Sequence, residues 1–127
     1  MKNSNIRYFN THTEGFGYLN GLKEIHPKPG QNFKPFLAST FTLLEGNPDS
    51  PKKKYIDVQI VGEKLSEFFK GYQQQLNCET PVFLNLRLAD LNADVWGEPG
   101  NQKIKWSAKV INVLYMKVGD VVVQLKE

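Results

Sequence analysis

Residues 55–76 have the sequence YIDVQIVGEKLSEFFKGYQQQL, in which the spacing of the apolar residues changes once. Over residues 55–61 apolar and polar side chains alternate, which is typical of a β-strand with one buried face. Over residues 63–76 the apolar side chains recur every three or four positions, which predicts an amphipathic helix. Gly62 separates the two patterns, and Asn77 marks the end of the helix. A half-exposed strand that leads into the only predicted helix is therefore the central feature of the chain.

Two strands are predicted before this segment, at residues 16–24 and 36–44. Residues 27–30, PKPG, indicate a turn between them. Residues 46–51, GNPDSP, cannot continue a strand pairing because proline lacks the amide donor, so they predict a hairpin loop.

The helix is followed by a regular alternation over residues 82–88, which predicts a fourth strand. The polar residues 90–103, rich in glycine, asparagine and aspartate, predict a loop. A long strand is predicted at residues 104–117, and its alternation shifts register near residues 110–111, as at a β-bulge. A turn then leads into a short last strand at residues 121–123.

This order of elements predicts an all-β fold, because a single helix cannot cover both faces of a parallel sheet. A five- to six-stranded antiparallel barrel with one α-helix between strands 3 and 4 is the oligonucleotide-binding (OB) fold. An unrelated barrel with the same element order is the alternative. We expect an amino-terminal arm at residues 1–15 and a single OB domain at residues 16–127.

The composition is that of an ordinary globular domain, with 127 residues, of which 40% are hydrophobic and 23% charged. One cysteine and two histidines offer no internal disulfide and no metal-ligand spacing, so we expect no metal and no cofactor. The net charge of +3 permits a polyanionic partner without requiring one. Because no long apolar run or signal core is present, we expect a cytoplasmic protein without membrane contact.

Several segments resemble the bacterial single-stranded-DNA-binding proteins. Residues 55–67, YIDVQIVGEKLSE, are similar to the third strand and helix start of that family. Residues 96–102, WGEPGNQ, are similar to its tryptophan and glycine-containing turn before the fifth strand, and weaker similarities lie at residues 19–22 and 41–43. Residues 8–20, YFNTHTEGFGYLN, are closer still to small replication proteins of integrative and conjugative elements. The resemblance implies an OB fold that binds single-stranded DNA during replication or transfer of such an element.

The chain departs from the pattern of that family in two places. Family members typically carry a glycine-rich linker and an acidic tail that recruits replication partners, whereas this sequence ends at residues 123–127, directly after the predicted barrel. We therefore expect no recruitment through a tail. Val61 stands where the family often has a phenylalanine, so one surface for base stacking is expected to be missing.

Binding of single strands without sequence preference requires aromatic faces for the bases and cations for the phosphates. Tyr55 projects opposite the buried residues of its strand, and Trp96 lies among polar residues where no core pattern requires an indole. Both are candidates for stacking. The alternative for Tyr55 is an exposed or interface tyrosine, and the alternative for Trp96 is a loop residue folded onto the barrel. Trp106 shares a strand face with Ala108, so burial explains it equally well. Phe83 lies on the strand face opposite the aliphatic residues, where it could contact either nucleic acid or a second subunit.

Basic residues occupy predicted loops and outward strand faces. Lys52, Lys53 and Lys54 lie in the loop before the third strand, where they could hold phosphates or form ordinary solvated surface. Five others extend the same argument: Lys28, Lys34, Arg87, Lys105 and Lys109.

No arrangement typical of catalysis is found, and Asp90 and Asp94 lie in a predicted loop where carboxylates are usually solvated. We therefore predict that the protein is not an enzyme and binds single-stranded nucleic acid, with DNA expected over RNA. The alternative is an OB-fold interaction subunit of a replication or conjugation complex, without nucleic-acid affinity. An enzyme or enzyme inhibitor on the same scaffold is a third hypothesis.

A homo-oligomer, dimer or tetramer, is predicted because a partly open barrel leaves strand edges that favour association. The last strands also carry apolar residues that the pattern places outside, namely Val113, Tyr115 and Val121.

Overall fold

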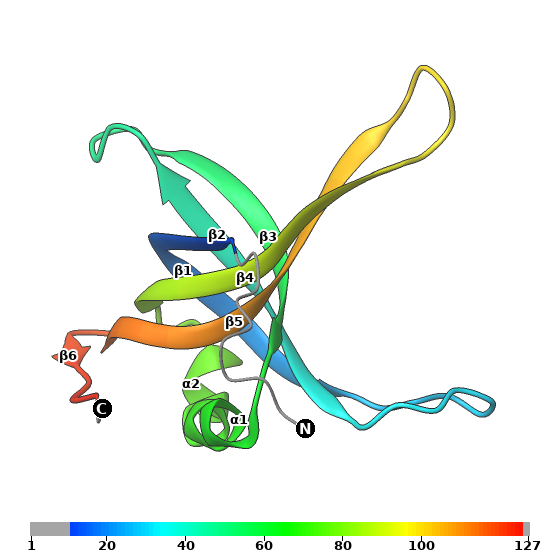
Figure 1. Cartoon of the computed structure of the whole chain (residues 1–127). Helices are drawn as coiled ribbons and strands as arrows, with labels where there is room; N and C mark the ends of the chain where they lie inside the picture. The colour runs from blue at the N-terminus through cyan, green and yellow to red at the C-terminus, as the bar shows by residue number, and fades with distance from the viewer. Residues whose placement is uncertain (1–10, 126–127) are drawn as a thin grey trace, which may run out of the picture.

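A computed structural model describes residues 11–125 of the chain (Figure 1). In chain order, its elements are β1 (His12–Ile25), β2 (Phe36–Glu45), β3 (Lys52–Ile60), α1 (Glu63–Lys70), α2 (Gln73–Leu76), β4 (Val82–Trp96), β5 (Lys103–Val118) and β6 (Val121–Val122). Within residues 11–125, no helix combines the length and the hydrophobicity needed to cross a bilayer.

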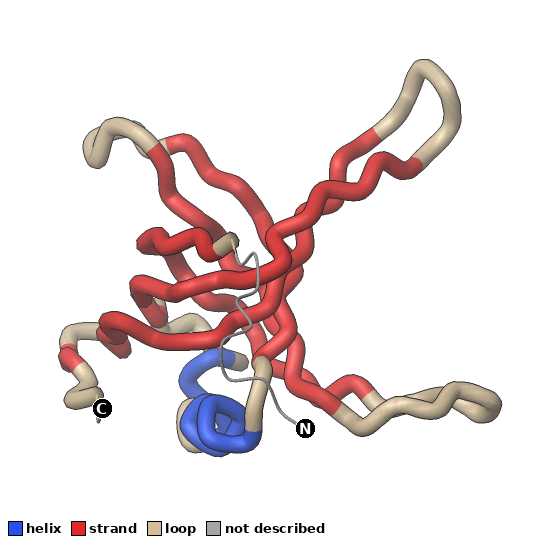
Figure 2. The backbone as a smooth tube through the Cα atoms, in the orientation of Figure 1, coloured by secondary structure: helices blue, strands red, loops and turns tan. Residues whose placement is uncertain are grey.

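The strands form one six-stranded sheet in the order β3-β2-β1-β4-β5-β6, and neighbouring strands in this order are antiparallel. The sheet closes into a barrel because β3 also pairs with β5, in parallel, from Ile56 beside Trp106 to Ile60 beside Val110. Figure 2 shows the strands curving around a common interior, with the helices at one end of the barrel. The predicted fold class, an OB barrel with its helical segment between β3 and β4, is confirmed.

The core lies inside the barrel and consists of the inward faces of all five long strands. Phe41 of β2, Ile56 of β3 and Leu86 of β4 are completely buried. Phe69 of α1 and Leu76 of α2 are also buried and pack against these strands, so the helical segment closes one end of the barrel.

The helical segment is interrupted, whereas the sequence predicts one continuous helix. The amide of Tyr72 donates to the carbonyl of Phe69 at 3.0 Å. This hydrogen bond spans three residues, as in a 3₁₀-helix, and it ends α1 before α2 begins. Gly62 precedes α1 with φ of 92°, a conformation that glycine adopts without strain, and is its N-cap as predicted. The Asn77 side chain then joins α2 to β1, because its Oδ1 accepts from the Leu22 amide at 2.7 Å.

The predicted loop at residues 90–103 is correct only for residues 97–102, because residues 90–96 and Lys103 belong to the strands of a two-stranded arm. β4 continues to Trp96, and β5 begins at Lys103, directly opposite it. We call residues 91–105 the β4–β5 arm; it projects from the barrel at the upper right of Figure 1. Its side chains are mostly exposed on both faces, so no apolar alternation marks it as a strand. Asp90, with φ of 54°, lies in a register irregularity where the arm leaves the barrel.

Two strands begin earlier than the sequence predicts. Lys52, Lys53 and Lys54 belong to β3 and pair with the end of β2, so their assignment to a loop is wrong. β1 begins at His12, because it pairs with β4 from that residue onward. Of the expected arm at residues 1–15, the last four residues are thus part of β1, and residues 1–10 lie outside the described residues.

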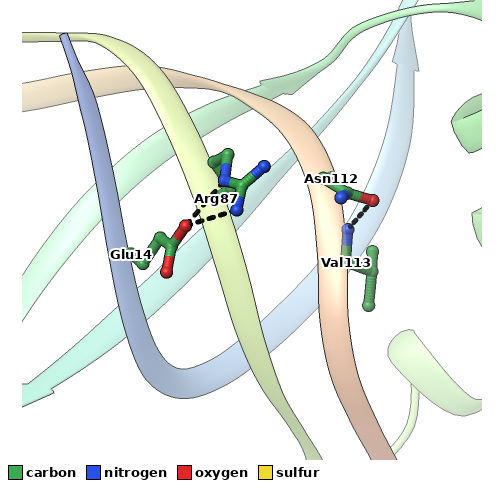
Figure 3. A network of polar contacts seen from close by, with 4 residues as sticks. All are labelled: Glu14, Arg87, Asn112 and Val113. Carbon is green, nitrogen blue, oxygen red and sulfur yellow. Dashed lines mark hydrogen bonds and ion pairs between the residues drawn. The ribbon is translucent and has the colours of Figure 1, made fainter.

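The predicted bulge in β5 is confirmed, and a second follows it. Ile111 and Leu114 both lack a partner in the register with β4. The Oδ1 atom of Asn112 accepts the amide of Val113 at 2.9 Å beside the first bulge (Figure 3). Each bulge reverses which side chains face inward. Val113 is therefore buried, and its predicted exposure is wrong.

Candidate nucleic-acid interface

An open groove of about 650 Å³ lies between β3 and the β4–β5 arm. β3 and β5 are paired at this point, while the arm extends beyond the barrel, so the two form separate walls. Seven residues line the groove, which we call the arm groove: Tyr55, Asp57, Asp94, Trp96, Ile104, Lys105 and Trp106. Four of the residues predicted to bind nucleic acid are thus brought together.

Tyr55 lies on the outward face of β3, as the alternation predicts. Its neighbours Lys54 and Ile56 belong to the opposite face, where Ile56 is buried in the core. Tyr55 is 62% exposed, and its cross-strand partner on β2 is the small residue Thr42. A planar ligand therefore has access to the tyrosine ring.

Trp96 is the last residue of β4, not a loop residue as the sequence predicts. It is 56% exposed, although it lies within a regular strand pair opposite Lys103. The Lys103 Nζ lies 5.7 Å from the centre of the indole ring, within the range of a cation–π contact. The indole is held by the arm rather than folded onto the barrel core.

Trp106 combines a structural role with access to the groove. It is half-buried, packs against the core and continues the inward face that contains Ala108 and Val110. The Lys54 Nζ lies 4.5 Å from the centre of its ring and 3.6 Å from a carboxylate oxygen of Glu45. Trp106 is therefore partly buried and also lines the arm groove, and its role in base stacking stays a prediction.

Carboxylates accompany two more of the predicted lysines besides Lys54. The Lys105 Nζ lies 3.7 Å from Asp57 Oδ2 inside the arm groove, and the Lys109 Nζ lies 3.2 Å from Asp90 Oδ2. Such pairs at exposed positions contribute little to stability. Each nevertheless reduces the positive charge that its lysine presents to a phosphate.

Of the predicted lysines, Lys105 alone lines the arm groove. Lys52 and Lys53 are exposed at the start of β3, and Lys53 shares the outward face of Tyr55. Lys28 and Lys34 are exposed in the β1–β2 loop, which also carries Phe33, 38% exposed and 5.8 Å from the ring centre of Phe36.

Phe83 lies on a different surface, the outer face of β1, β4 and β5. Its ring stacks on Phe16 with centres 5.4 Å apart and lies 5.2 Å from Tyr18 and 6.3 Å from Tyr115. We call these four residues the aromatic cluster. Phe83 does not line the arm groove.

Arg87 lies beside the aromatic cluster and is engaged by a carboxylate. Its Nη2 and Nε atoms lie 2.6 and 2.7 Å from Glu14 Oε2, on the neighbouring strand β1 (Figure 3). A charge-assisted pair of this geometry holds the guanidinium in place and leaves it less available to a phosphate.

Sequence reasoning missed three residues of the arm groove: Asp57, Asp94 and Ile104. Asp57 follows Tyr55 by two positions and Asp94 precedes Trp96 by two, so strand alternation places each carboxylate on the same face as an aromatic residue. It also missed Phe16, whose ring contacts Phe83 of β4 and Tyr115 of β5.

A second hollow, of about 470 Å³, lies beside the irregular part of β1 and is lined by Asn20, Lys23, Thr40 and Asn77, among others. None of the predicted binding residues lines it. Asp57 borders both hollows.

Reactive groups are sparse in the described part of the chain. Among residues 11–125, no group of three or more histidine, cysteine, aspartate or glutamate residues is placed to hold a metal ion. Hydrogen bonds with Thr80 lower the pKa of the exposed Cys78 thiol, because they stabilise the thiolate.

The family described as "Protein of unknown function (DUF3577)" matches residues 2–127 of the chain. The chain belongs to this family. No curated protein sequence matches it significantly.

The DUF3577 chain is similar to solved structures of single-stranded DNA-binding proteins. Rim1, a mitochondrial single-stranded DNA-binding protein from S. cerevisiae, has a TM-score of 0.52 and 8% identity, with 87% of this chain and 96% of Rim1 covered. A second Rim1 structure has a TM-score of 0.49 and 10% identity, with 87% of this chain and 95% of Rim1 covered. The small single-stranded DNA-binding protein from Streptomyces coelicolor has a TM-score of 0.43 and 10% identity, with 86% of this chain and 94% of that protein covered. The likeness to the first Rim1 structure agrees with the OB fold described above.

Proposed function

We propose that this DUF3577 protein binds single-stranded nucleic acid, with DNA as the expected form, and acts by binding rather than catalysis. The observation that carries the proposal is the exposure of Tyr55 and Trp96 on two walls of one groove. Large exposed rings in a groove indicate a binding surface, and rings of this kind stack bases of any sequence. In a duplex the base faces are covered by neighbouring bases, so the groove favours unpaired strands.

A titration of intrinsic tryptophan fluorescence tests the proposal. Addition of a single strand of about 30 nucleotides, longer than the site of one OB fold, is expected to quench the emission, because a base stacks on Trp96. Duplex of equal length is the control and is expected to leave the emission nearly unchanged. Absence of quenching and of binding with the single strand would favour the alternative, an interaction subunit without nucleic-acid affinity.

We further propose that the protein acts in replication or transfer of an integrative and conjugative element. The resemblance of residues 8–20 to small replication proteins of such elements supports this role. Deletion of the coding sequence is expected to reduce element transfer or copy number. Unchanged transfer and copy number would contradict the proposal.

Replacement of Lys52, Lys53 and Lys54 by alanine is expected to make the affinity for single-stranded DNA less sensitive to salt. Each lost phosphate contact flattens the slope of log affinity against log salt by about 0.7. Lys54 already contacts Glu45 and the Trp106 ring, so the variant Lys52→Ala with Lys53→Ala should retain most of the effect.

The control for this prediction is Lys64→Ala with Lys70→Ala, which removes the same charge from α1, away from the start of β3 (Figure 1). Its salt slope should stay close to that of the natural protein. If the two double variants have equal slopes, the start of β3 does not contact the phosphates.

We also propose a homo-oligomer, a dimer or tetramer, that associates through the aromatic cluster. Phe16 is 45% exposed, and its ring stacks on Phe83, which leaves an exposed apolar surface for a second copy. The nearby Arg87 is engaged by Glu14, so this face offers less positive charge to a nucleic acid than the start of β3 does. These features favour a protein occupant.

Light scattering is expected to give a multiple of the chain mass of 14.5 kDa at micromolar concentration. Phe16→Lys should reduce the mass towards that of one chain, because it places a charge in the aromatic cluster. Phe33→Lys, an equivalent change at an exposed loop residue, is the control and should not. A measured mass of 14.5 kDa for the natural protein in solution would contradict the proposed oligomer.

A further inference from the structure

We infer that the arm groove selects bases that carry an exocyclic amino group, and prefers cytosine to uracil or thymine. This inference rests on the proposed function and concerns what the same groove recognises. The observation behind it is that each exposed ring of the groove has a carboxylate beside it. Tyr55 is accompanied by Asp57 on β3, and Trp96 by Asp94 on β4.

Strand geometry explains why rings and carboxylates occur together. Asp57 follows Tyr55 by two positions, and Asp94 precedes Trp96 by two, so both pairs project from the same face of their strands. The cross-strand partner of Asp94 is Lys105, which also lines the groove. The arm groove therefore contains two carboxylates and a single ammonium group.

The carboxylate of Asp57 remains available to a ligand. The Lys105 Nζ lies 3.7 Å from Asp57 Oδ2, close enough for attraction but longer than a hydrogen bond. On the other wall, Asp94 Oδ1 accepts a long bond of 3.3 Å from Asn92 Nδ2. Both carboxylates thus retain lone pairs that can accept hydrogen bonds from a bound group.

The charge of the groove determines which part of a nucleotide enters it. Two carboxylates repel phosphates, so the backbone is expected to follow lysines at the rim, such as Lys53 and Lys103, while the bases enter between the rings. A base edge that meets Asp57 or Asp94 must then supply a donor. Cytosine presents its N4 amino group there, whereas uracil and thymine present the O4 carbonyl, which a carboxylate repels.

Lys105 does not reverse this preference. Its ammonium group can donate to the O2 carbonyl of a pyrimidine, but cytosine, uracil and thymine all carry O2. At position 4, the amino group of cytosine can donate to a carboxylate and the O4 carbonyl of uracil or thymine cannot, so the two carboxylates favour cytosine there.

The experiment compares oligodeoxycytidylate with oligodeoxyuridylate, both of about 30 nucleotides so that either exceeds the site of one OB fold. The two polymers differ in the group at position 4 and in the protonation of N3, and neither carries the methyl group of thymine. At mildly alkaline pH, where cytosine is neutral, we expect the natural protein to bind oligodeoxycytidylate about five- to tenfold more tightly.

Asp57→Asn and Asp94→Asn should each bring the affinity ratio closer to one, because an amide can donate to O4 as well as accept from N4. Asp120→Asn, in the turn before β6, removes the same charge away from the groove and is the matched control. It should keep the natural ratio. A ratio of two affinities is insensitive to the general gain in polyanion binding that loss of any carboxylate produces.

Equal affinities in the natural protein, or tighter binding of oligodeoxyuridylate, would overturn the inference and leave the proposed function standing. A preference for cytosine that persists in both Asp57→Asn and Asp94→Asn would overturn the role of the carboxylates. If neither oligonucleotide binds, the proposed function fails and the inference fails with it. Circular dichroism of each variant verifies the fold, and the comparison within the natural protein does not depend on the variants.

Discussion

Trp96→Ala is expected to weaken the binding of single-stranded DNA by about 1–3 kcal/mol, or roughly 5- to 150-fold, at every salt concentration. The indole is 56% exposed at the end of β4, so its removal takes away a stacking surface without opening the core. Because stacking involves no counterion release, the salt slope should stay nearly constant. Titrations at several salt concentrations measure both quantities.

The control for this prediction is Val95→Ala. Val95 neighbours Trp96 on the same strand, is 61% exposed and does not line the arm groove. Its truncation should leave the affinity within about twofold, because it changes exposed apolar area but no stacking ring. Normal binding by Trp96→Ala would mean that the indole serves the structure of the arm and that the binding site lies elsewhere.

Phe41→Ala is expected to lower the free energy of unfolding by about 3–5 kcal/mol. Phe41 is completely buried on β2, which lies between β1 and β3, and its cross-strand partners are Leu19 of β1 and Ile56 of β3. The truncation leaves a cavity that the barrel cannot readily close. Urea denaturation, at one protein concentration for all variants because an oligomer gains stability with concentration, measures the change.

Phe33→Ala provides the comparison for Phe41→Ala. It removes the same side chain from the β1–β2 loop, where the ring is 38% exposed, and should change the stability by less than about 1 kcal/mol. Similar losses for the two variants would contradict the placement of Phe41 inside the barrel.

Much of the fold could be predicted from the sequence, because burial of one strand face leaves an alternation that the chain displays directly. Residues 82–88 and the strand before Gly62 are examples, and both lie in the barrel wall. The β4–β5 arm could not be predicted, because its strands are exposed on both sides and carry no such pattern. The start of β3 at Lys52 could not be predicted for the same reason. A run of three lysines has no apolar alternation that would indicate its pairing with β2.

The candidate site was predicted in part. Tyr55 and Trp96 were identified because each ring stands where no core pattern requires it, and their exposure is confirmed. Asp57 was missed, because a carboxylate on an outward face resembles ordinary surface until the arm is seen opposite it. Arg87 was selected for its charge, but its partner Glu14 is a residue of another strand, and only the register of β1 and β4 brings the two together.

The parallel seam between β3 and β5 also has a consequence for how the chain folds. Ile56 and Trp106 are neighbours across this seam although about 50 positions separate them in the sequence. The antiparallel pairs β2–β3 and β4–β5 are hairpins and can form locally, whereas the seam requires both hairpins and the helical segment to be in place. Its loop-closure entropy is lost before its contacts are gained, so we expect closure of the barrel to be the slow, late step of folding. Until that step is complete, both seam strands present free edges to other chains.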